Sequence, residues 1–246
     1  SSFAELDYYW GEATLLYDAP SKAAGGEVTE ATHIGPALLK IFDSAQRELI
    51  VISPYFVPGE DLVEYFGRLV ERGVRVRILT NSLAANDVSL VHSGYMRYRP
   101  DLVKNGVELY EYKPAAGSDE QQQKKSWTGS SKASLHAKTF GVDRQFLFVG
   151  SFNLDPRSVL HNTEMGVLFE SADLAGELGD GFDSRLMQKA YRLQFRQGSA
   201  MTATSDLEWV TEEGGAEVHY FKEPETSFLQ RFTSRFLSIF VPESML

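Results

Sequence analysis

Two short segments near the middle of the chain carry polar side chains whose types and spacing could support catalysis. The first contains His136 and Lys138, and the second contains Ser151 and Asn153. Side chains two residues apart on a strand point to the same face, so a predicted strand over residues 136–142 brings His136 and Lys138 together. Lys138 would supply positive charge, Ser151 and Asn153 directed hydrogen-bond donors, and His136 a nucleophile or an acid–base group. This set of groups suits a phosphodiester.

A histidine and a lysine at this spacing are common by chance, but the complete pattern is far more specific. The pattern is H-x-K, four residues, D, six residues and then G-S-x-N, matched by His136, Lys138, Asp143, Gly150, Ser151 and Asn153. It resembles the signature of the phospholipase D superfamily. The resemblance extends from about residue 7 to residue 246, with similar segments at 52–58, 79–82, 92–95, 155–158 and 162–164, and at Asp87. Within the superfamily the sequence resembles the C-terminal half of the bacterial cardiolipin synthase branch.

Members of this superfamily use two copies of the motif, which face each other across a pseudo-two-fold axis. The resemblance implies that one histidine attacks phosphorus, while the other protonates the leaving alcohol and then deprotonates the incoming one. A pKa near neutrality suits histidine to both roles. The resemblance also implies that Lys138 and Asn153 hold the phosphoryl oxygens, with no metal ion or cofactor.

This chain has a single copy of the motif, because none of His33, His92, His161 and His219 is followed by a lysine two residues later. We favour the interpretation that the chain is the C-terminal half of a two-copy enzyme, since its first twenty residues read like a link from an earlier domain. The alternative is a homodimer that supplies both histidines by symmetry. The copy in the second half usually carries the acid–base histidine, so the resemblance assigns that role to His136.

Further candidate site residues lie around the motif. Asp143 belongs to the catalytic motif, but it sits at a predicted tight turn, where we favour a structural role. Glu164 is a candidate to orient the histidine of the opposite half, or else a surface glutamate on a strand. The predicted substrate-binding residues are Tyr55, Phe56, Asn81, His92, Tyr95 and Arg157. The alternatives are core positions for the two aromatic residues at 55 and 56, and a structural role for the histidine at 92.

Helices and strands alternate along the part of the chain that must position these residues. Apolar spacing predicts helices near residues 34–42, 62–70, 90–104 and 173–194, and strands near 13–17, 48–53, 74–79, 107–112, 136–142, 145–150 and 163–170. The alternation favours an α/β protein, a layered α-β-α sandwich with a mixed, largely parallel sheet. We predict a lead-in segment or linker over residues 1–30 and a phospholipase D-like domain over residues 31–246.

The composition is that of a globular chain with an acidic surface. Of the 246 residues 43% are hydrophobic, and 24 Lys and Arg against 34 Asp and Glu give a net charge of −10. The absence of cysteine excludes disulfides, thiolate metal sites and a cysteine nucleophile. No apolar run approaches the roughly 20 residues that a membrane span needs. The acidic charge argues against a nuclease, which should show a broad basic groove.

We therefore predict a phosphatidyltransferase similar to bacterial cardiolipin synthases, acting on phosphatidylglycerol or phosphatidylethanolamine. The expected partners are phospholipid substrates, a second copy of the motif and a membrane surface, with no nucleic acid. The expected location is the bacterial cytoplasmic membrane, bound peripherally. The alternatives are a phospholipase D, phosphodiesterase or nuclease that hydrolyses its substrate as a homodimer, and a non-catalytic half.

Two other segments could contact lipid. A long polar loop is predicted over residues 114–134, and it contains a basic and aromatic cluster made of Lys124, Lys125, Trp127 and Lys132. The tail over residues 228–246 shows phenylalanines at helical spacing with arginines between them. Such an amphipathic helix can lie in a membrane interface or dock on its own domain.

Overall fold

The computed structural model describes residues 9–25, 29, 32–86, 89–114 and 134–240. Within these residues ten strands form one sheet, in the order β1-β7-β6-β5-β2-β3-β4-β8-β9-β10. The strands are β1 (Glu12–Tyr17), β2 (Glu48–Ile52), β3 (Arg75–Asn81), β4 (Glu108–Tyr112), β5 (Thr139–Val142), β6 (Phe146–Gly150), β7 (Met165–Glu170), β8 (Ala190–Phe195), β9 (Leu207–Glu213) and β10 (Ala216–Tyr220). The α-helices are α1 (Ile34–Asp43), α2 (Gly59–Glu71), α3 (Ser89–Tyr95), α4 (Arg99–Lys104), α5 (Pro156–Leu160), α6 (Ala172–Lys189) and α7 (Phe228–Phe240).

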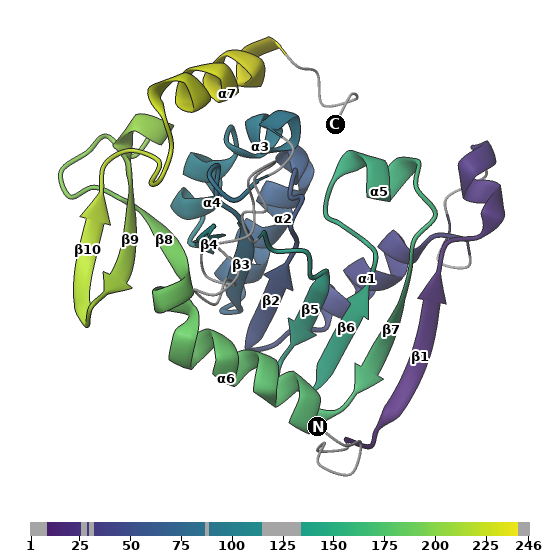
Figure 1. The fold of residues 1–246 in the computed structure, drawn as a ribbon. Coiled ribbons are helices and arrows are strands. Elements are labelled where there is room, and N and C mark those ends of the chain that lie inside the picture. The colour runs from purple at the N-terminus through teal and green to yellow at the C-terminus, as the bar shows by residue number, and fades with distance from the viewer. Residues whose placement is uncertain (1–8, 26–28, 30–31, 87–88, 115–133, 241–246) are drawn as a thin grey trace, which may run out of the picture.

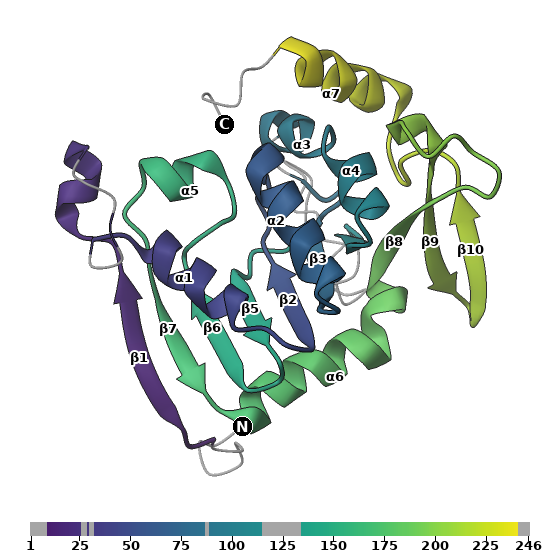
Figure 2. The same cartoon turned by 180° about the vertical axis from the view of Figure 1, so that it is seen from behind.

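The predicted α/β class and layered sandwich are confirmed, and strand β2 shows why. All five of its residues are buried, and the four apolar ones, residues 49–52, alternate between two apolar clusters. Leu49 and Val51 face a core shared with α1 and α2, whereas Ile50 and Ile52 face a second core shared with α6. Figures 1 and 2 accordingly show α6 on one face of the sheet and α1 and α2 on the other.

The sheet is mixed, as predicted, but the expectation that it is largely parallel is wrong. Among the described pairs, β2 with β3 and β3 with β4 are parallel, and the other seven pairs are antiparallel. The reason is that short turns connect several neighbouring strands, and a short turn can join only antiparallel strands. The predicted tight turn at Asp143 and Arg144 is one of them, with φ of 52° and 56°. Gly214 and Gly215, with φ of 60° and 81°, form another between β9 and β10.

Two predicted helices are shorter than expected. The helix predicted over residues 90–104 is divided into α3 and α4, and Pro100 lies in the first turn of the second helix, where its missing N–H costs nothing. The helix predicted over residues 173–194 ends at Lys189, and the chain continues as β8. Strand β8 joins β4 to β9, so residues 190–220 extend the sheet on one side.

The N-terminal region contributes an edge strand to this sheet. Strand β1 pairs with β7 along its whole length, from Glu12 opposite Glu170 to Tyr17 opposite Met165. A boundary near residue 30 therefore does not separate these residues from the sheet. The basic and aromatic cluster predicted within residues 124–132 and the candidate Asp87 lie outside the described residues.

Candidate active site

The His136 and Lys138 pair lies directly before β5, at one edge of the sheet. The predicted strand over residues 136–142 begins only at Thr139. Strand β5 runs antiparallel to β2, so Thr139 stands opposite Ile52, the last residue of β2. The pair therefore sits at the carboxyl edge of β2, β3 and β4, which we call the motif edge. Figure 1 shows α3 and α5 at this same edge.

Hydrogen bonds hold the backbone just before His136 and at Lys138. The Leu135 N–H donates to Oδ1 of Asn81 at 2.9 Å, and Nδ2 of Asn81 donates to the Leu135 carbonyl at 3.1 Å. The Gly150 N–H donates to the Lys138 carbonyl at 3.1 Å. Asn81 was predicted to bind substrate, but these bonds use its amide to hold the chain next to His136. The structure thus gives it a positioning role.

Lys138 and His136 form an adjacent cation and imidazole. The Lys138 ammonium Nζ lies 3.2 Å from Nε2 of His136 and donates to the His136 carbonyl at 3.0 Å. The lysine is 9% exposed, whereas the histidine is exposed. A buried ammonium beside an exposed imidazole can hold an anion against a group that transfers protons or attacks phosphorus.

Ser151 and Asn153 are joined through a buried hydroxyl and a carboxylate. The Ser151 hydroxyl donates to Oε2 of Glu164, and the Ser158 hydroxyl donates to Oε1 of Glu164 at 2.8 Å. The Asn153 N–H in turn donates to the Ser158 hydroxyl at 3.3 Å. Asp155 caps α5 and accepts the Ser158 N–H at 2.8 Å. Glu164 therefore orients the serine–asparagine segment of its own half, and its predicted role toward a second histidine stays a prediction.

The Asn153 amide is buried, and its Oδ1 has no hydrogen-bond partner among the described residues. Buried polar atoms of this kind carry a free-energy penalty until something satisfies them. A ligand whose hydroxyl or protonated group reached Oδ1 would remove that penalty, whereas the predicted contact with a phosphoryl oxygen would use the Nδ2 donor of the same amide.

Gly150 is required because β6 and β7 approach closely beside the motif. Gly150 and Gly166 stand opposite each other, and the Phe148 ring covers both. A Cβ atom on Gly150 would lie 2.5 Å from the Met165 carbonyl oxygen. This backbone approach leaves no room for a side chain.

Asp143 has the structural role that the turn predicts. Its two carboxylate oxygens accept the backbone N–H groups of Gln46, Arg47 and Glu48 at 2.7 to 2.9 Å. It lies at the far end of β5 from Lys138, roughly 15 Å away at strand geometry. The aspartate in the motif thus fixes the turn to β2 and stays apart from the reacting groups.

Three of the predicted substrate-binding residues are core residues. Phe56 and Tyr95 are 1% and 2% exposed, and their rings lie 5.8 Å apart. His92 is 1% exposed and accepts a 2.7 Å hydrogen bond at Nε2 from Arg99. This placement argues against a contact of these three with substrate, because their side chains complete the packing beneath the motif edge. Tyr55 is half-buried and Arg157 is exposed, so both could contact a ligand.

A buried ion pair that the sequence did not indicate supports the site from the N-terminal region. Asp18 accepts the Glu164 N–H and the Ile34 N–H, each at 2.8 Å. Lys22 donates to Asp18 and to the Ser158 carbonyl, each at 2.7 Å. An aspartate and a lysine four residues apart are too common for their spacing alone to have revealed this contact.

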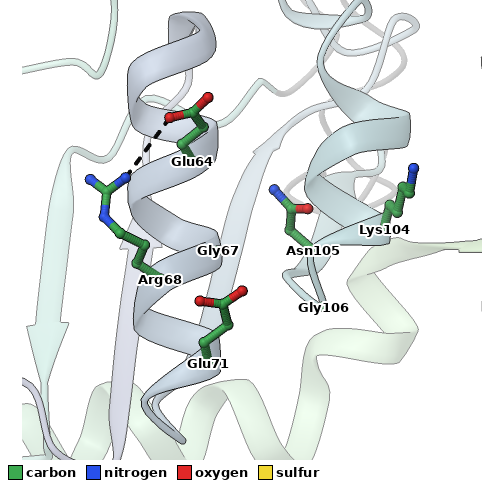
Figure 3. A pocket seen from close by; sticks show the side chains of 7 residues that line it. All are labelled: Glu64, Gly67, Arg68, Glu71, Lys104, Asn105 and Gly106. Carbon is green, nitrogen blue, oxygen red and sulfur yellow. Dashed lines mark ion pairs between the residues drawn. The ribbon is translucent and has the colours of Figure 1, made fainter.

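A second hollow lies away from the motif edge. A hollow of about 540 Å³ lies between α2 and the end of α4, lined by Glu64, Gly67, Arg68, Glu71, Lys104, Asn105 and Gly106 (Figure 3). It lies toward the amino ends of β3 and β4, away from His136. Among the described residues, no group of three histidine or carboxylate side chains is placed to hold a metal ion. None of the described helices has the length and apolar character that crossing a membrane requires.

Fold and site together define an α/β protein whose sheet presents a lysine–histidine pair and a serine–asparagine pair at one edge. A family model described as "Cardiolipin synthase, PLD-like domain" matches residues 38–186. The chain is 41% identical over 241 residues to cardiolipin synthase C of Escherichia coli (strain K12), which covers 98% of this chain and 50% of that protein. This chain belongs to the family of phospholipase D-like domains of cardiolipin synthases.

Solved structures show the same fold. Nuc of Salmonella typhimurium, a phospholipase D family member, superposes with a TM-score of 0.52 at 16% identity, over 74% of this chain and 99% of that one. Phosphatidylserine synthase of Haemophilus influenzae gives a TM-score of 0.54 at 16% identity, over 73% of this chain and 39% of that one. The chain spans about half the length of the curated relatives it matches.

Proposed function

We propose that this chain forms one half of a phosphatidyltransferase site of the phospholipase D type. The observation that carries the proposal is the Lys138 ammonium, buried against the His136 imidazole at the edge where Asn153 also lies. One such edge supplies one histidine. A second copy of the motif would supply the other, so that two imidazoles face one phosphodiester.

In this proposal His136 is the acid–base group. The histidine of the other half attacks phosphorus, and its P–N bond forms as the P–O bond to the leaving alcohol breaks. Protonated His136 gives its proton to the leaving oxygen. Neutral His136 then accepts the proton of the incoming alcohol, whose oxygen attacks phosphorus and breaks the P–N bond. Lys138 and Asn153 would hold the phosphoryl oxygens through both steps.

Family membership supports a substrate class. The relative from E. coli is a cardiolipin synthase, which supports a reaction that joins two phosphatidyl groups through glycerol. With phosphatidylglycerol as donor the leaving alcohol is glycerol, and with phosphatidylethanolamine it is ethanolamine. The acceptor is the free glycerol hydroxyl of a phosphatidylglycerol. These substrates place the protein at the surface of the bacterial cytoplasmic membrane.

The second half has two possible sources. The relatives at about twice this length favour another half within one longer polypeptide. The match to this chain covers 99% of the Nuc chain, so the Nuc chain contains about one such half. That likeness favours the alternative, a homodimer. In the alternative, two copies of this chain form a homodimer and hydrolyse a phosphodiester with water as acceptor.

The test is metal-free phosphodiesterase activity of the chain alone, in EDTA, on bis(p-nitrophenyl) phosphate. Two matched variants are compared with the wild type, His136→Asn at the motif and His219→Asn at an exposed position on β10. Activity that falls at least about a hundredfold in His136→Asn and persists in His219→Asn indicates a complete site made by two copies.

No activity from a folded chain favours the longer polypeptide, in which His136→Asn is then tested again. Loss of turnover there with retained folding supports the proposal. Unchanged turnover there would contradict it, and would identify this half as a non-catalytic partner.

A further inference from the structure

Helix α7 turns its apolar side away from the protein. Phe228, Leu229 and Phe232 are 75%, 66% and 56% exposed. The rings of Phe228 and Phe232 stack at a centroid distance of 6.3 Å, and Phe236 continues the row one turn later. At 100° per residue these four side chains cover about a third of the helix circumference. We call them the aromatic face.

The polar side of α7 makes the contacts with the domain. Ser234 is 1% exposed, and Leu237 and Ser238 are half-buried. Arg231 donates to the carbonyl and the hydroxyl of Thr226, just before the helix. The helix packs against α3 at the motif edge (Figures 1 and 2). An amphipathic helix normally buries its apolar side, so this reversed orientation leaves the aromatic face for another surface.

Hydrogen bonds between Ser227 and Gln230 cap the N-terminus of α7. The Gln230 N–H donates to the Ser227 hydroxyl at 3.2 Å, and the Ser227 N–H donates to Oε1 of Gln230 at 2.8 Å. This is a reciprocal capping box, which satisfies two backbone donors that the first turn would otherwise leave open. The cap stabilises the first turn of α7, and the packing of the helix against α3 sets which side faces outward.

The charge on α7 is opposite to that of the chain. The helix contains Arg231 and Arg235 and no acidic residue, although the whole chain has a net charge of −10. Arg235 also lines a hollow of about 330 Å³ together with Arg97, Thr204, Ser205 and Ser238. The Ser238 and Thr204 hydroxyls donate to the backbone carbonyls of Arg235 and Met96, so the two guanidinium groups are the part of this hollow suited to a phosphate group.

We propose that α7 docks this protein on an anionic phospholipid bilayer, with the aromatic face in the interface and the Arg97 and Arg235 hollow around a lipid phosphate. An exposed aromatic face bordered by arginines matches the headgroup and acyl boundary of such a membrane. In a two-fold dimer through this face the arginines of one α7 would lie against those of the other, so like charges would meet and a second copy is the poorer match. The inference extends the proposed function by placing the motif edge toward the membrane that holds the substrates.

The experiment measures binding of the 246-residue chain to sucrose-loaded vesicles by sedimentation. The vesicles contain phosphatidylcholine alone or with phosphatidylglycerol, and no turnover is involved, so the docking surface and the proposed reaction can fail separately. The variants are Phe228→Ser with Phe232→Ser, and Arg235→Glu. The matched controls are Trp10→Ser, which is 88% exposed before β1, and Arg68→Glu on α2.

We expect the double phenylalanine variant to lower partitioning onto phosphatidylglycerol vesicles at least about tenfold. Arg235→Glu lowers it several-fold, and only on the anionic vesicles, while the two controls bind as the wild type does. Because all the substituted side chains are exposed, circular dichroism should be unchanged.

Equal partitioning of all variants would overturn the proposal. So would a wild-type dimer in light scattering that the double phenylalanine variant converts to a monomer without any change in vesicle binding. In that case the aromatic face would join two copies of the chain.

Discussion

At the residue scale, His92 shows how burial decides what a histidine can do. Its side chain is enclosed with Tyr95 and Arg99, and Arg99 also pairs with the buried carboxylates of Glu111 and Glu223. Burial lowers the pKa of His92 well below its ordinary value of 6.5, and the adjacent Arg99 charge lowers it further. His92 is therefore a neutral acceptor in the folded protein.

This pKa shift predicts a loss of stability toward acid. Below about pH 6.5 the unfolded chain binds a proton at His92 that the folded chain does not bind. The free energy of unfolding should then fall with decreasing pH, by up to about 1.4 kcal/mol per pH unit from this group. His92→Gln keeps an acceptor for Arg99 but cannot titrate, so urea denaturation between pH 6.5 and 5.5 should show a slope smaller by about one proton.

His219 provides the control for this measurement. It is exposed on β10, and hydrogen bonding to Glu208 and then to Glu217 raises its pKa. That shift has the opposite sign, because its stabilisation is lost as pH rises. His219→Gln should therefore keep the acid-side loss. Identical pH slopes for the wild type and His92→Gln would contradict the assignment of His92 as a buried neutral group.

The sequence indicates candidate reacting residues, but it does not indicate the contacts that support them. The roles suggested for Lys138 and Asn153 depend on residue type and spacing, and both can be read directly from the amino-acid sequence. The turn role of Asp143 was also predictable, because aspartate commonly satisfies backbone donors at tight turns. The sequence did not show that the side chains of Phe56, His92 and Tyr95 are buried. Burial beside a strand end depends on which face of the sheet the next helix covers.

At the scale of elements, the link between β1 and α5 supports the site most directly. Asp18, at the end of β1, accepts backbone N–H groups from α1 and from the Glu164 region, and its charge is balanced by Lys22. The side chains of Asp18 and Lys22 are 0% and 1% exposed. Removing one partner of such a pair leaves a buried charge without compensation.

We expect Asp18→Ala to lower the free energy of unfolding by about 3–5 kcal/mol. The double variant Asp18→Ala with Lys22→Met should recover part of that loss, since it removes the isolated charge. Asp61→Ala, at an exposed position on α2, is the matched control and should change stability by less than about 0.5 kcal/mol. Urea denaturation of the four proteins measures these differences. Additive losses in the double variant would show that Asp18 and Lys22 are not coupled.

The elements themselves were predicted where periodicity is strong. The buried run of β2 and the apolar spacing of α1 and α2 are clear local signals. The helix predicted over residues 173–194 includes most of β8, because residues 190–194 continue an apolar pattern that helices and strands share over short lengths. The strand directions were not predictable from propensity, since they depend on the length and geometry of each connection.

At the scale of the whole molecule, the charge and the apolar surface are distributed unevenly. The chain is acidic overall, but the motif edge carries Lys138, and the neighbouring α7 carries arginines beside exposed phenylalanines. Net charge alone would argue against contact with an anionic surface. A local basic and aromatic region can still provide that contact, because charges farther than about 8–10 Å away are largely screened at physiological salt.

The proposed mechanism requires His136 to be the acid–base group of a site that a second histidine completes. The most direct test uses a polypeptide that contains both halves, with His136→Asn compared with the wild type on two donors that differ in their leaving group. One donor releases p-nitrophenol, measured as a pre-steady-state burst, and the other releases glycerol from phosphatidylglycerol. A p-nitrophenolate ion leaves without protonation, whereas a glycerol oxygen needs a proton.

We predict that His136→Asn slows the release of glycerol at least about a hundredfold but largely preserves the p-nitrophenolate burst. That result would separate proton donation from nucleophilic attack. An equal loss with both donors would contradict the account, because it would make His136 the nucleophile or a purely structural residue.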